Sequence, residues 1–306
     1  MNRSFLQGLT VTSICLLATG CAWLRSGDPP AKATASSVGE DAVAGTTLAD
    51  KRLAEIQAEQ QALAEAYARD ANQFDATEWQ RRLRQLADRY DAYLAENPED
   101  TTALILYGKF LRSVDATEQA VEVFLRVDQI DPDIAVVKQQ IGNYLAENGR
   151  YMAALTYFLR ALELDPEVAR YHFQVGELLF RYREEFLLDG LYSRSDLDAA
   201  MLDAFRQAYQ FEPDNTGFAL RLGEAFYDIR DPDWAAARTH WETVLAQVDE
   251  PLTRDACRLH LARVLGKLGQ LDKARELAET VTAPALQHSR NALLTELDGG
   301  SASADG

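Results

Sequence analysis

Residues 97–167 read NPEDTTALILYGKFLRSVDATEQAVEVFLRVDQIDPDIAVVKQQIGNYLAENGRYMAALTYFLRALELDPE and contain three acidic turns, each with a proline at its centre. Pro98, Pro132 and Pro166 follow one another at intervals of 34 residues. A proline cannot continue a helix and disfavours helical conformation in the residue before it, so each turn ends one helix and lets the next begin. The interval therefore predicts a repeated helical hairpin.

Small and aromatic residues recur at matching places between these prolines. They are Gly108, Ala120 and Phe124 in the first interval, and Gly142, Ala154 and Phe158 in the second. We expect the small residues where two helices cross closely, and the aromatic rings in the space between one hairpin and the next. The pattern resembles the tetratricopeptide repeat. That resemblance implies an all-α fold in which helical hairpins stack into a solenoid with a right-handed superhelical twist.

Three less regular units follow the same scheme. In the third unit, 37 residues separate Gly176 from Pro213, where the first two units have 24, so we expect an insertion of 13 residues near 183–196. The fourth unit carries Gly223, Ala237 and Trp241, and the fifth, with Ala262, Ala274 and Pro284, lacks the aromatic residue. The sequence thus predicts about five repeats over residues 98–298, with degenerate units at the end, where a repeat has only one neighbour.

A helical hairpin is predicted over residues 48–97, ahead of the repeats. Apolar residues recur there at helical spacing; one stripe is Leu53, Ile56, Leu63 and Tyr67, and the other is Trp79, Leu83, Leu86, Tyr90 and Leu94. We expect the hairpin to cover the open end of the solenoid, although Gln60 interrupts its first stripe. Asp75 with Glu78, and Asp115 with Glu118, match the capping-box pattern that begins a helix.

The first 21 residues differ in character from the rest of the chain. Arg3 precedes a short apolar stretch that suits a signal peptide over residues 1–20 and is too short to span a bilayer. Leu17-Ala18-Thr19-Gly20-Cys21 resembles the bacterial lipobox, although Ala18 stands where the family more often has leucine. The resemblance implies acylation of Cys21. An ordinary signal peptide with a chance cysteine is the alternative.

The residue after Cys21 bears on the location of the lipidated protein. Ala22 follows the cysteine, where the best-known retention signal has aspartate, so the resemblance implies anchoring in the outer membrane on its periplasmic face. Residues 21–47 are rich in small residues, and we expect a flexible linker there. A small-residue tail without structure is predicted for 299–306.

Charge and motifs narrow the possible functions. A formal net charge of −17 argues against nucleic-acid binding, which requires basic patches. The four histidines show no metal-ligand spacing, and no phosphate-binding loop or nucleophile motif is present. Cys257 is the one cysteine expected in the mature chain outside the anchor, and we expect it buried and inert. The sequence therefore indicates neither an enzyme nor a cofactor or metal site.

Two surfaces are candidates for binding a protein partner. The first helix of each tetratricopeptide hairpin lines the inner surface, and carrying those positions over gives Lys109, Arg112, Gln139, Asn143, Glu177, Phe180, Arg181, Glu224 and Tyr227. The second candidate is the insertion, with five large apolar residues: Phe186, Leu187, Leu188, Leu191 and Tyr192. A merely solvated inner face, and an insertion that packs on a neighbouring repeat, are the respective alternatives.

The leading hypothesis is a membrane-anchored scaffold or adaptor that holds protein partners in the bacterial cell envelope. Its layout resembles repeat lipoproteins that support outer-membrane protein insertion or pilus assembly, and others that gather cell-wall hydrolases and proteases. The alternative is a regulator that activates a periplasmic cell-wall enzyme by direct contact. Fold does not fix function, so neither the partner nor the oligomeric state follows from the sequence.

Overall fold

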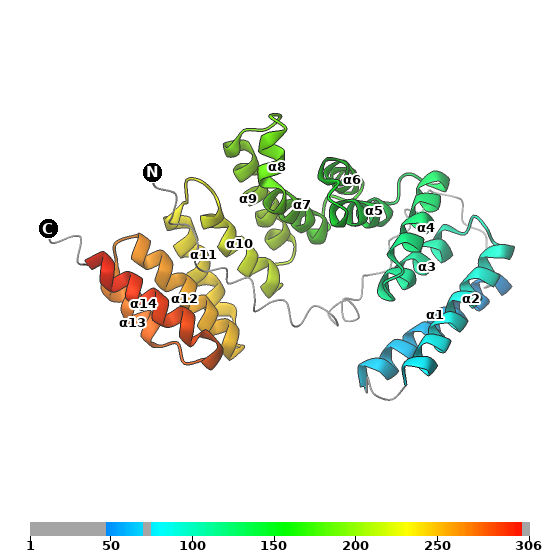
Figure 1. Cartoon of the computed structure of the whole chain (residues 1–306), viewed down its shortest axis with the longest axis horizontal. Coiled ribbons are helices and arrows are strands. Elements are labelled where there is room, and N and C mark those ends of the chain that lie inside the picture. The colour runs from blue at the N-terminus through cyan, green and yellow to red at the C-terminus, as the bar shows by residue number, and fades with distance from the viewer. Residues whose placement is uncertain (1–46, 70–74, 302–306) are drawn as a thin grey trace, which may run out of the picture. The chain divides into compact units, whose positions relative to one another are not determined.

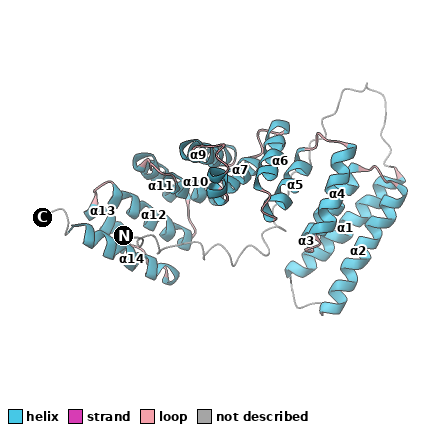
Figure 2. Ribbon diagram, turned by 45° about the horizontal axis from the view of Figure 1, so that its top comes forward, coloured by secondary structure: helices cyan, strands magenta, loops and turns pink. Residues whose placement is uncertain are grey.

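The computed structural model describes residues 47–69 and 75–301, and the secondary structure in these two ranges is all helical. The chain divides into two compact units, and the boundary lies between Tyr144 and Leu145. Within each unit, most helices that follow one another along the chain lie side by side (Figures 1 and 2). The expected signal peptide, Cys21, and all of the linker except Thr47 lie outside the described residues.

Among its described residues, the first unit contains four helices and most of a fifth. These are α1 (Leu48–Arg69), α2 (Ala76–Glu96), α3 (Thr101–Ser113), α4 (Thr117–Ile130) and α5 (Ala135–Glu147), which crosses the boundary. The second unit continues with α6 (Tyr151–Leu164), α7 (Ala169–Arg181), α8 (Arg183–Leu188), α9 (Arg194–Phe211), α10 (Thr216–Asp228), α11 (Trp234–Gln247), α12 (Pro251–Lys267), α13 (Leu271–Glu279), the 3-10 helix η2 (Pro284–Leu286) and α14 (Gln287–Ser301).

Each proline turn lies between two helices, as the spacing predicts. Pro98 follows α2, Pro132 follows α4, Pro166 follows α6 and Pro213 follows α9. The prediction of an all-α fold built from helical hairpins is therefore confirmed. The hairpins place the first helix of each repeat at α3, α5, α7, α10 and α12.

The repeat glycines hold the two helices of a hairpin close together. A β-carbon at Gly108 would lie 2.7 Å from the ring of Phe124, and one at Gly176 would lie 2.7 Å from the ring of Phe205. Both rings come from the second helix of the same hairpin. These rings therefore fill the space that the glycine leaves within one hairpin. The Phe205 ring also faces the next hairpin, as expected, because the Arg221 guanidinium carbon of α10 lies 4.4 Å from its centroid.

The leading hairpin packs as the apolar stripes predict. The rings of Tyr67 and Trp79 join α1 to α2, with centroids 4.7 Å apart. Gln60, which interrupts the first stripe, accepts a hydrogen bond of 2.7 Å from the hydroxyl of Tyr90. The ring of Tyr90 also stacks on Tyr107 of α3 at 5.1 Å. Tyr90 thus joins the leading hairpin to the first repeat.

The two predicted capping boxes differ in outcome. The Asp75 carboxylate accepts a hydrogen bond of 2.8 Å from the Glu78 backbone N–H, while the Glu78 side chain pairs with two arginines of its own helix. The Asp115 prediction is wrong, because α4 begins after Ala116 without a side-chain cap. Asp115 instead has a φ of 60°, in the left-handed region.

This left-handed residue belongs to a turn that three hairpins share. Gly149 and Gly269 occupy the same place between first and second helices, with φ of 70° and 75°. In each turn the next residue donates its N–H to a carbonyl five residues earlier, as Ala116 does to Leu111 at 2.9 Å. Glycine is the usual residue where φ is positive, so Asp115 is the exception.

The insertion in the third repeat forms α8, the turn 189–193 and the beginning of α9. The hairpin of α7 and α9 still closes across it, because the Gly176 and Phe205 contact is kept. The additional residues therefore project from the end of the hairpin and leave its core packing in place.

The fifth repeat uses different residues where its two helices pack together. Ala262 stands where the other repeats have glycine, and Ala278 stands where they have an aromatic ring. Both alanines are fully buried, together with Ala274. In this repeat, two alanines thus replace the pairing of a glycine with a large aromatic ring.

The last helix closes the second unit. A β-carbon at Gly266 of α12 would lie 2.6 Å from a methyl group of Leu297, so α14 packs closely on α12. The helix continues to Ser301. Residues 299–301 are therefore helical, which corrects the beginning of the unstructured tail predicted for 299–306.

Candidate functional site

The first-helix residues of the first unit contribute mainly half-buried polar side chains. Lys109 and Arg112 lie on α3 and Asn143 on α5, all partly exposed. Gln139 is different, since only 2% of it is exposed and its side-chain oxygen accepts a hydrogen bond of 2.9 Å from Gln140. Three of these four candidates therefore reach the surface of the first unit.

In the second unit, Arg221 of α10 brings the predicted residues together. Its Nε donates to Glu177 of α7 at 2.6 Å, and its Nη1 lies 2.8 Å from the Asp228 carboxylate. Glu224 lies farther from the same guanidinium, at 3.8 Å. The Arg221 side chain is largely buried. Three carboxylates, carried by the first helices α7 and α10, surround this one cation.

Phe180 covers the same guanidinium and still reaches solvent. The Arg221 guanidinium carbon lies 4.3 Å from the centroid of the Phe180 ring and 4.4 Å from that of Phe205. Of Phe180, 38% is exposed. Cation–π contacts of this kind orient an aromatic ring as well as stabilise it. The predicted residues Glu177, Phe180 and Glu224 therefore form a fixed surface.

Burial shapes the chemistry of Glu224. Its pKa is raised above the ordinary value, because desolvation outweighs the favourable charges of Arg221 and Arg263. The remaining first-helix candidate of α7, Arg181, lies exposed at the end of that helix. We call the surface formed by Glu177, Phe180, Arg181 and Glu224 the first-helix face of the second unit.

Tyr227 mainly packs against the neighbouring helices. Its hydroxyl hydrogen-bonds to the Nδ1 atom of His260 on α12. The His260 ring in turn stacks on Trp241 of α11, with centroids 4.5 Å apart. Desolvation, helped by the charge of Arg263, lowers the pKa of His260 to about 3. Tyr227 thus ties three helices together, and only part of it reaches the surface.

The insertion consists of a buried part and an exposed part. Phe186 is fully buried and Leu187 half-buried, so neither forms the outer surface. The exposed fractions of Leu188, Leu191 and Tyr192 are 85%, 68% and 38%. We call these last three residues the tip.

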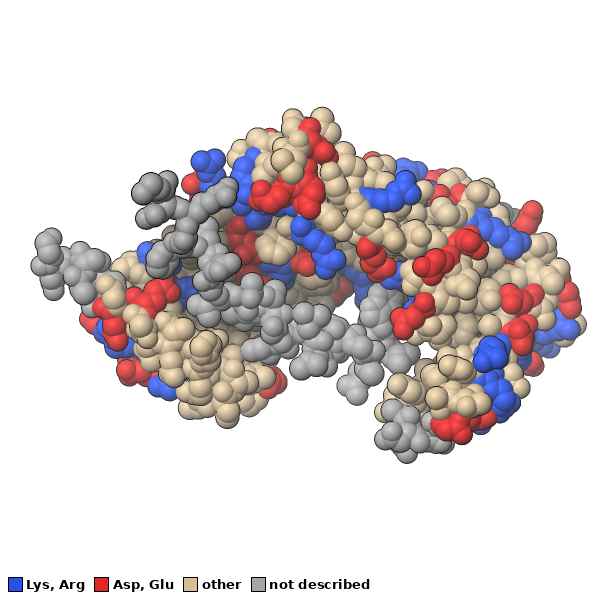
Figure 3. Space-filling model, viewed as in Figure 1, with Lys and Arg blue, Asp and Glu red and all other residues tan. Residues whose placement is uncertain are grey.

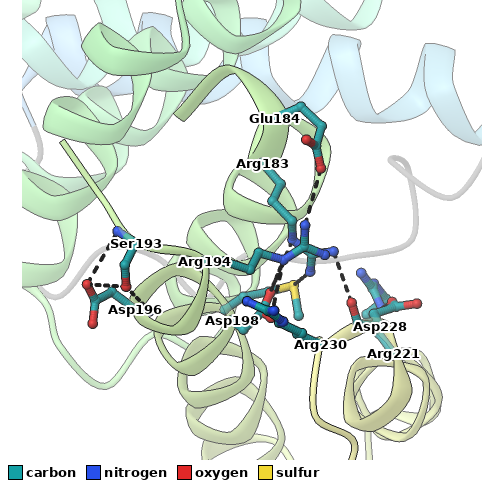
Figure 4. A network of polar contacts seen from close by, with 10 residues as sticks. Arg183, Glu184, Ser193, Arg194, Asp196, Asp198, Arg221, Asp228 and Arg230 are labelled. Atoms are coloured by element: carbon teal, nitrogen blue, oxygen red, sulfur yellow. Dashed lines mark hydrogen bonds and ion pairs between the residues drawn. The ribbon is translucent and has the colours of Figure 1, made fainter. Parts of the chain in front are cut away.

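Below the tip, a buried carboxylate organises the polar contacts shown in Figure 4. Asp198 of α9 lies 3.3 Å from Arg183, accepts from Arg194 at 3.1 Å, and accepts from the Arg230 backbone N–H at 2.8 Å. Arg183 also donates to the carbonyl of Asp228 at 2.9 Å. Asp198 therefore ties α8 and α9 to the end of α10.

Sequence reasoning did not find Arg221 or Asp198. Arg221, Glu224 and Asp228 stand three and seven residues apart, so one face of α10 could have been read as an ion-paired stripe. The pairing with Glu177, however, joins residues 44 apart in sequence, and the contact between Asp198 and Arg230 spans 32 residues. Neither distance is part of the repeat pattern.

The described ranges contain neither a metal-binding cluster nor a membrane-spanning helix. Within them, no three His, Cys, Asp or Glu side chains are placed to hold a metal ion. Nor does any helix there have the length and apolar character needed to cross a membrane. Cys257 is buried, and desolvation raises the pKa of its thiol to about 11.

Comparisons with known proteins agree with the hairpin pattern. Residues 140–184 match a family model described as tetratricopeptide repeat. A structure from a study of PilF of Pseudomonas aeruginosa is similar, with 16% identity, a TM-score of 0.55, and coverage of 82% of this chain and 99% of that chain. YrrB, described as a tetratricopeptide repeat protein with an unusual peptide-binding site, has 18% identity, a TM-score of 0.51, and coverage of 63% and 90%. Curated protein sequences give no match.

Proposed function

This chain has the fold of a tetratricopeptide repeat protein, and from that premise we propose that it is a protein-interaction scaffold anchored to a membrane of the bacterial cell envelope. The fold supports the protein-binding role, because stacked hairpins display one helix of each pair as an extended surface. The lipobox-like residues before Cys21 support the anchor. The two parts of the proposal have separate tests.

The binding role rests on one observation, the first-helix face of the second unit. Phe180 remains exposed there although Arg221 fixes it from one side and a carboxylate, Glu177, lies beside it. An aromatic side chain with few rotamers, held in place before binding, loses little conformational entropy when a partner covers it. We expect a peptide segment of the partner to lie over this face.

Site-specific photocrosslinking in cells tests this face. A photoreactive phenylalanine derivative replaces Phe180 in one strain and Phe211 in the other. Phe211 is the matched control, because 39% of it is exposed and it lies on α9, a second helix. We expect a discrete protein adduct from position 180 and none of that mass from position 211. Equal adducts from both positions, or none from 180, would count against the face as the binding surface.

The anchor is tested by metabolic labelling with an alkyne fatty acid, followed by membrane fractionation. Cys21→Ala should abolish the label and release the chain from the membrane, since a lipid-anchored protein depends on its acyl chains for stable attachment. Cys257→Ala is the control and should keep both the label and the membrane fraction. Label retained by Cys21→Ala, or a chain that stays bound to the membrane, would refute this anchor.

A further inference from the structure

The tip is an apolar surface at the end of the α7–α9 hairpin. Leu188 and Leu191 are the two most exposed of its residues, and they flank a glycine turn at Gly190, where φ is 68°. Neither leucine contributes to the core of the repeat, which the Gly176 and Phe205 contact already closes. Clustered apolar side chains that a fold leaves in water, when a polar residue would serve the fold equally well, mark an interaction site.

The tip is held rigidly from below. The buried Phe186 ring meets Tyr151 edge-on at 5.0 Å and Tyr192 edge-on at 5.7 Å. The Tyr151 hydroxyl donates to the carboxylate of Asp189, at the start of the turn, at 2.9 Å. Ser193, at the end of the turn, closes a capping box with the first turn of α9. Both ends of the turn are thus fixed before any partner arrives, which lowers the entropy lost on binding.

Acidic side chains surround the tip. Glu184, Glu185, Asp189 and Asp196 are exposed, while the neighbouring Arg194 is already paired with Glu184 and Asp198. Figure 3 shows acidic side chains gathered in the α8 region at the top of the view, with fewer basic ones beside them. We call these four carboxylates the acidic rim.

The acidic rim favours one kind of binding partner for the tip over two others. An anionic lipid surface attracts basic segments, so a protrusion with an acidic rim is repelled from it. A second copy docked tip to tip would bring two acidic rims together, because a twofold interface places the same patch on both sides. A protein pocket that is apolar inside and lined with lysine or arginine at its edge complements both the tip and the rim.

We propose that the tip docks into such a pocket, apolar within and basic at its edge, on a second protein. This surface is distinct from the first-helix face, and it gives the scaffold a second point of attachment. The rim guides the approach and Leu188 and Leu191 provide the buried anchors. Either surface can fail its test without affecting the other.

The experiment begins with crosslinking in cells and continues with the purified pair. A photoreactive phenylalanine derivative at Leu188 of the full-length chain captures the occupant, and mass spectrometry maps the crosslinked peptide. The captured protein is then purified, and its affinity for the full-length chain is measured at low and at high salt. Vesicles containing phosphatidylglycerol and sedimentation of the chain alone test the lipid surface and the second copy.

We expect the crosslinked peptide to contain apolar residues with lysine or arginine beside them. The double variant Leu188→Ser/Leu191→Ser should weaken binding at least tenfold, as loss of a central apolar anchor does. Leu159→Ser is the control, since Leu159 is 45% exposed on α6, away from the insertion, and it should change nothing. Unchanged thermal unfolding of the double variant shows that the loss comes from the surface.

The rim has its own pair of variants. Glu185→Lys should weaken binding and reduce its dependence on salt, whereas Glu167→Lys, the same charge change at an exposed turn before α7, should do neither. Crosslinks to a second copy, to no protein or to an acidic peptide would overturn the proposal. Vesicle binding that depends on Leu188 and Leu191, or full affinity in the double variant, would overturn it as well.

Discussion

At the residue scale, three hairpins depend on the absence of a side chain at one position. The closest case is Gly223, where a β-carbon would lie 2.3 Å from the Trp241 ring. Trp241 is fully buried and also stacks on His260, so the ring has no free space to move into. The glycine is therefore required by its neighbour, and its own backbone conformation is ordinary helix.

Gly223→Ala should destabilise the protein by about 2 kcal/mol, because one methyl group overpacks a filled interior. Gly217→Ala, in the same helix, is the control: its β-carbon would meet only the Asn215 side-chain oxygen, at 3.3 Å. There the gain in helix propensity offsets the contact, and we expect a change below about 1 kcal/mol. Urea unfolding followed by circular dichroism measures both, and equal losses in the two variants would refute the packing account.

Asp115 gives a prediction of the opposite sign. Asp115→Gly should stabilise the protein by about 0.5–1 kcal/mol, because glycine adopts a positive φ without the steric cost that aspartate bears. Gly149→Ala, in the equivalent turn, should destabilise it by a similar amount. A lower melting temperature for Asp115→Gly would show that the aspartate side chain stabilises this turn in a way that its φ does not reveal.

Residue-level contacts were predictable only where the repeat marks them. Gly108 and Phe124 stand out because their spacing recurs at Gly142 and Phe158, yet the pattern does not say which ring faces which glycine. The contact of Arg221 with Glu177 could not be inferred, since Glu177 lies on another helix, whereas Asp228 lies on the same helix as Arg221. Periodicity reports which positions are buried, whereas pairing requires the crossing geometry of two helices.

At the scale of elements, the insertion is held by polar contacts as well as by the buried Phe186 ring. Asp198 receives hydrogen bonds from Arg194 and the Arg230 backbone, and it lies beside the buried Arg183. Burial lowers the pKa of Arg183 despite the nearby charge of Asp198. The desolvation cost of that arginine is therefore only partly compensated.

Asp198→Ala should cost about 3 kcal/mol, because it leaves the buried Arg183 guanidinium without its counter-charge and the Arg230 backbone N–H without its acceptor. Asp196→Ala, which removes an exposed capping contact two residues earlier, should cost about 1 kcal/mol. The double variant Arg183→Met/Asp198→Leu should lose less than Asp198→Ala alone, since both charges leave together. Chemical denaturation measures the three variants, and a loss for Asp198→Ala no larger than that for Asp196→Ala would contradict the account.

The sequence located the insertion but not its internal division. Counting from Gly176 to Pro213 shows that residues have been added, and the apolar run 186–188 shows that some of them seek cover. Phe186 and Leu188 are both large and apolar, yet one is fully buried and the other is the most exposed of its neighbours. Their difference arises from the turn at Gly190 and from Tyr151, which belongs to the preceding repeat.

At the scale of the whole molecule, stability should depend on pH through the half-buried histidines of the second unit. His260 has a folded pKa of about 3 against an ordinary 6.5, and its neighbours are the Tyr227 hydroxyl and Arg263. The unfolded chain therefore binds a proton that the folded chain excludes. The stabilisation is complete above pH 6.5 and is lost as the pH falls from there towards 3.

Between about pH 7.5 and about pH 5.5, His260 alone should lower the free energy of unfolding by about 1.4 kcal/mol. His240, whose pKa burial also lowers, adds to the loss. His260→Gln should show a smaller loss over the same interval, while the exposed turn variant Glu167→Lys should keep the original one. Urea titrations at the two pH values decide, and identical losses in His260→Gln and the unaltered chain would refute the assignment.

The division into two units was not predictable from the repeats. The 34-residue interval runs from Pro98 to Pro166 without interruption, and the boundary at residues 144 and 145 lies inside it. Recurrence reports that the same local structure forms again, whereas compact units depend on how densely successive hairpins contact one another. The fold class follows from the local pattern, but the division of the chain into two units does not.

The fifth repeat constrains the order in which its packing could have diverged from that of its neighbours. Exchanging glycine and a ring for Ala262 and Ala278 requires two substitutions, and the two intermediates are not equivalent. Alanine opposite a ring forces overlap, as at Gly223, whereas glycine opposite alanine leaves a void that nearby helices can partly close. A change from glycine and a ring to the two alanines should therefore lose the ring before the glycine is replaced. The order of the two substitutions in this repeat is thus constrained.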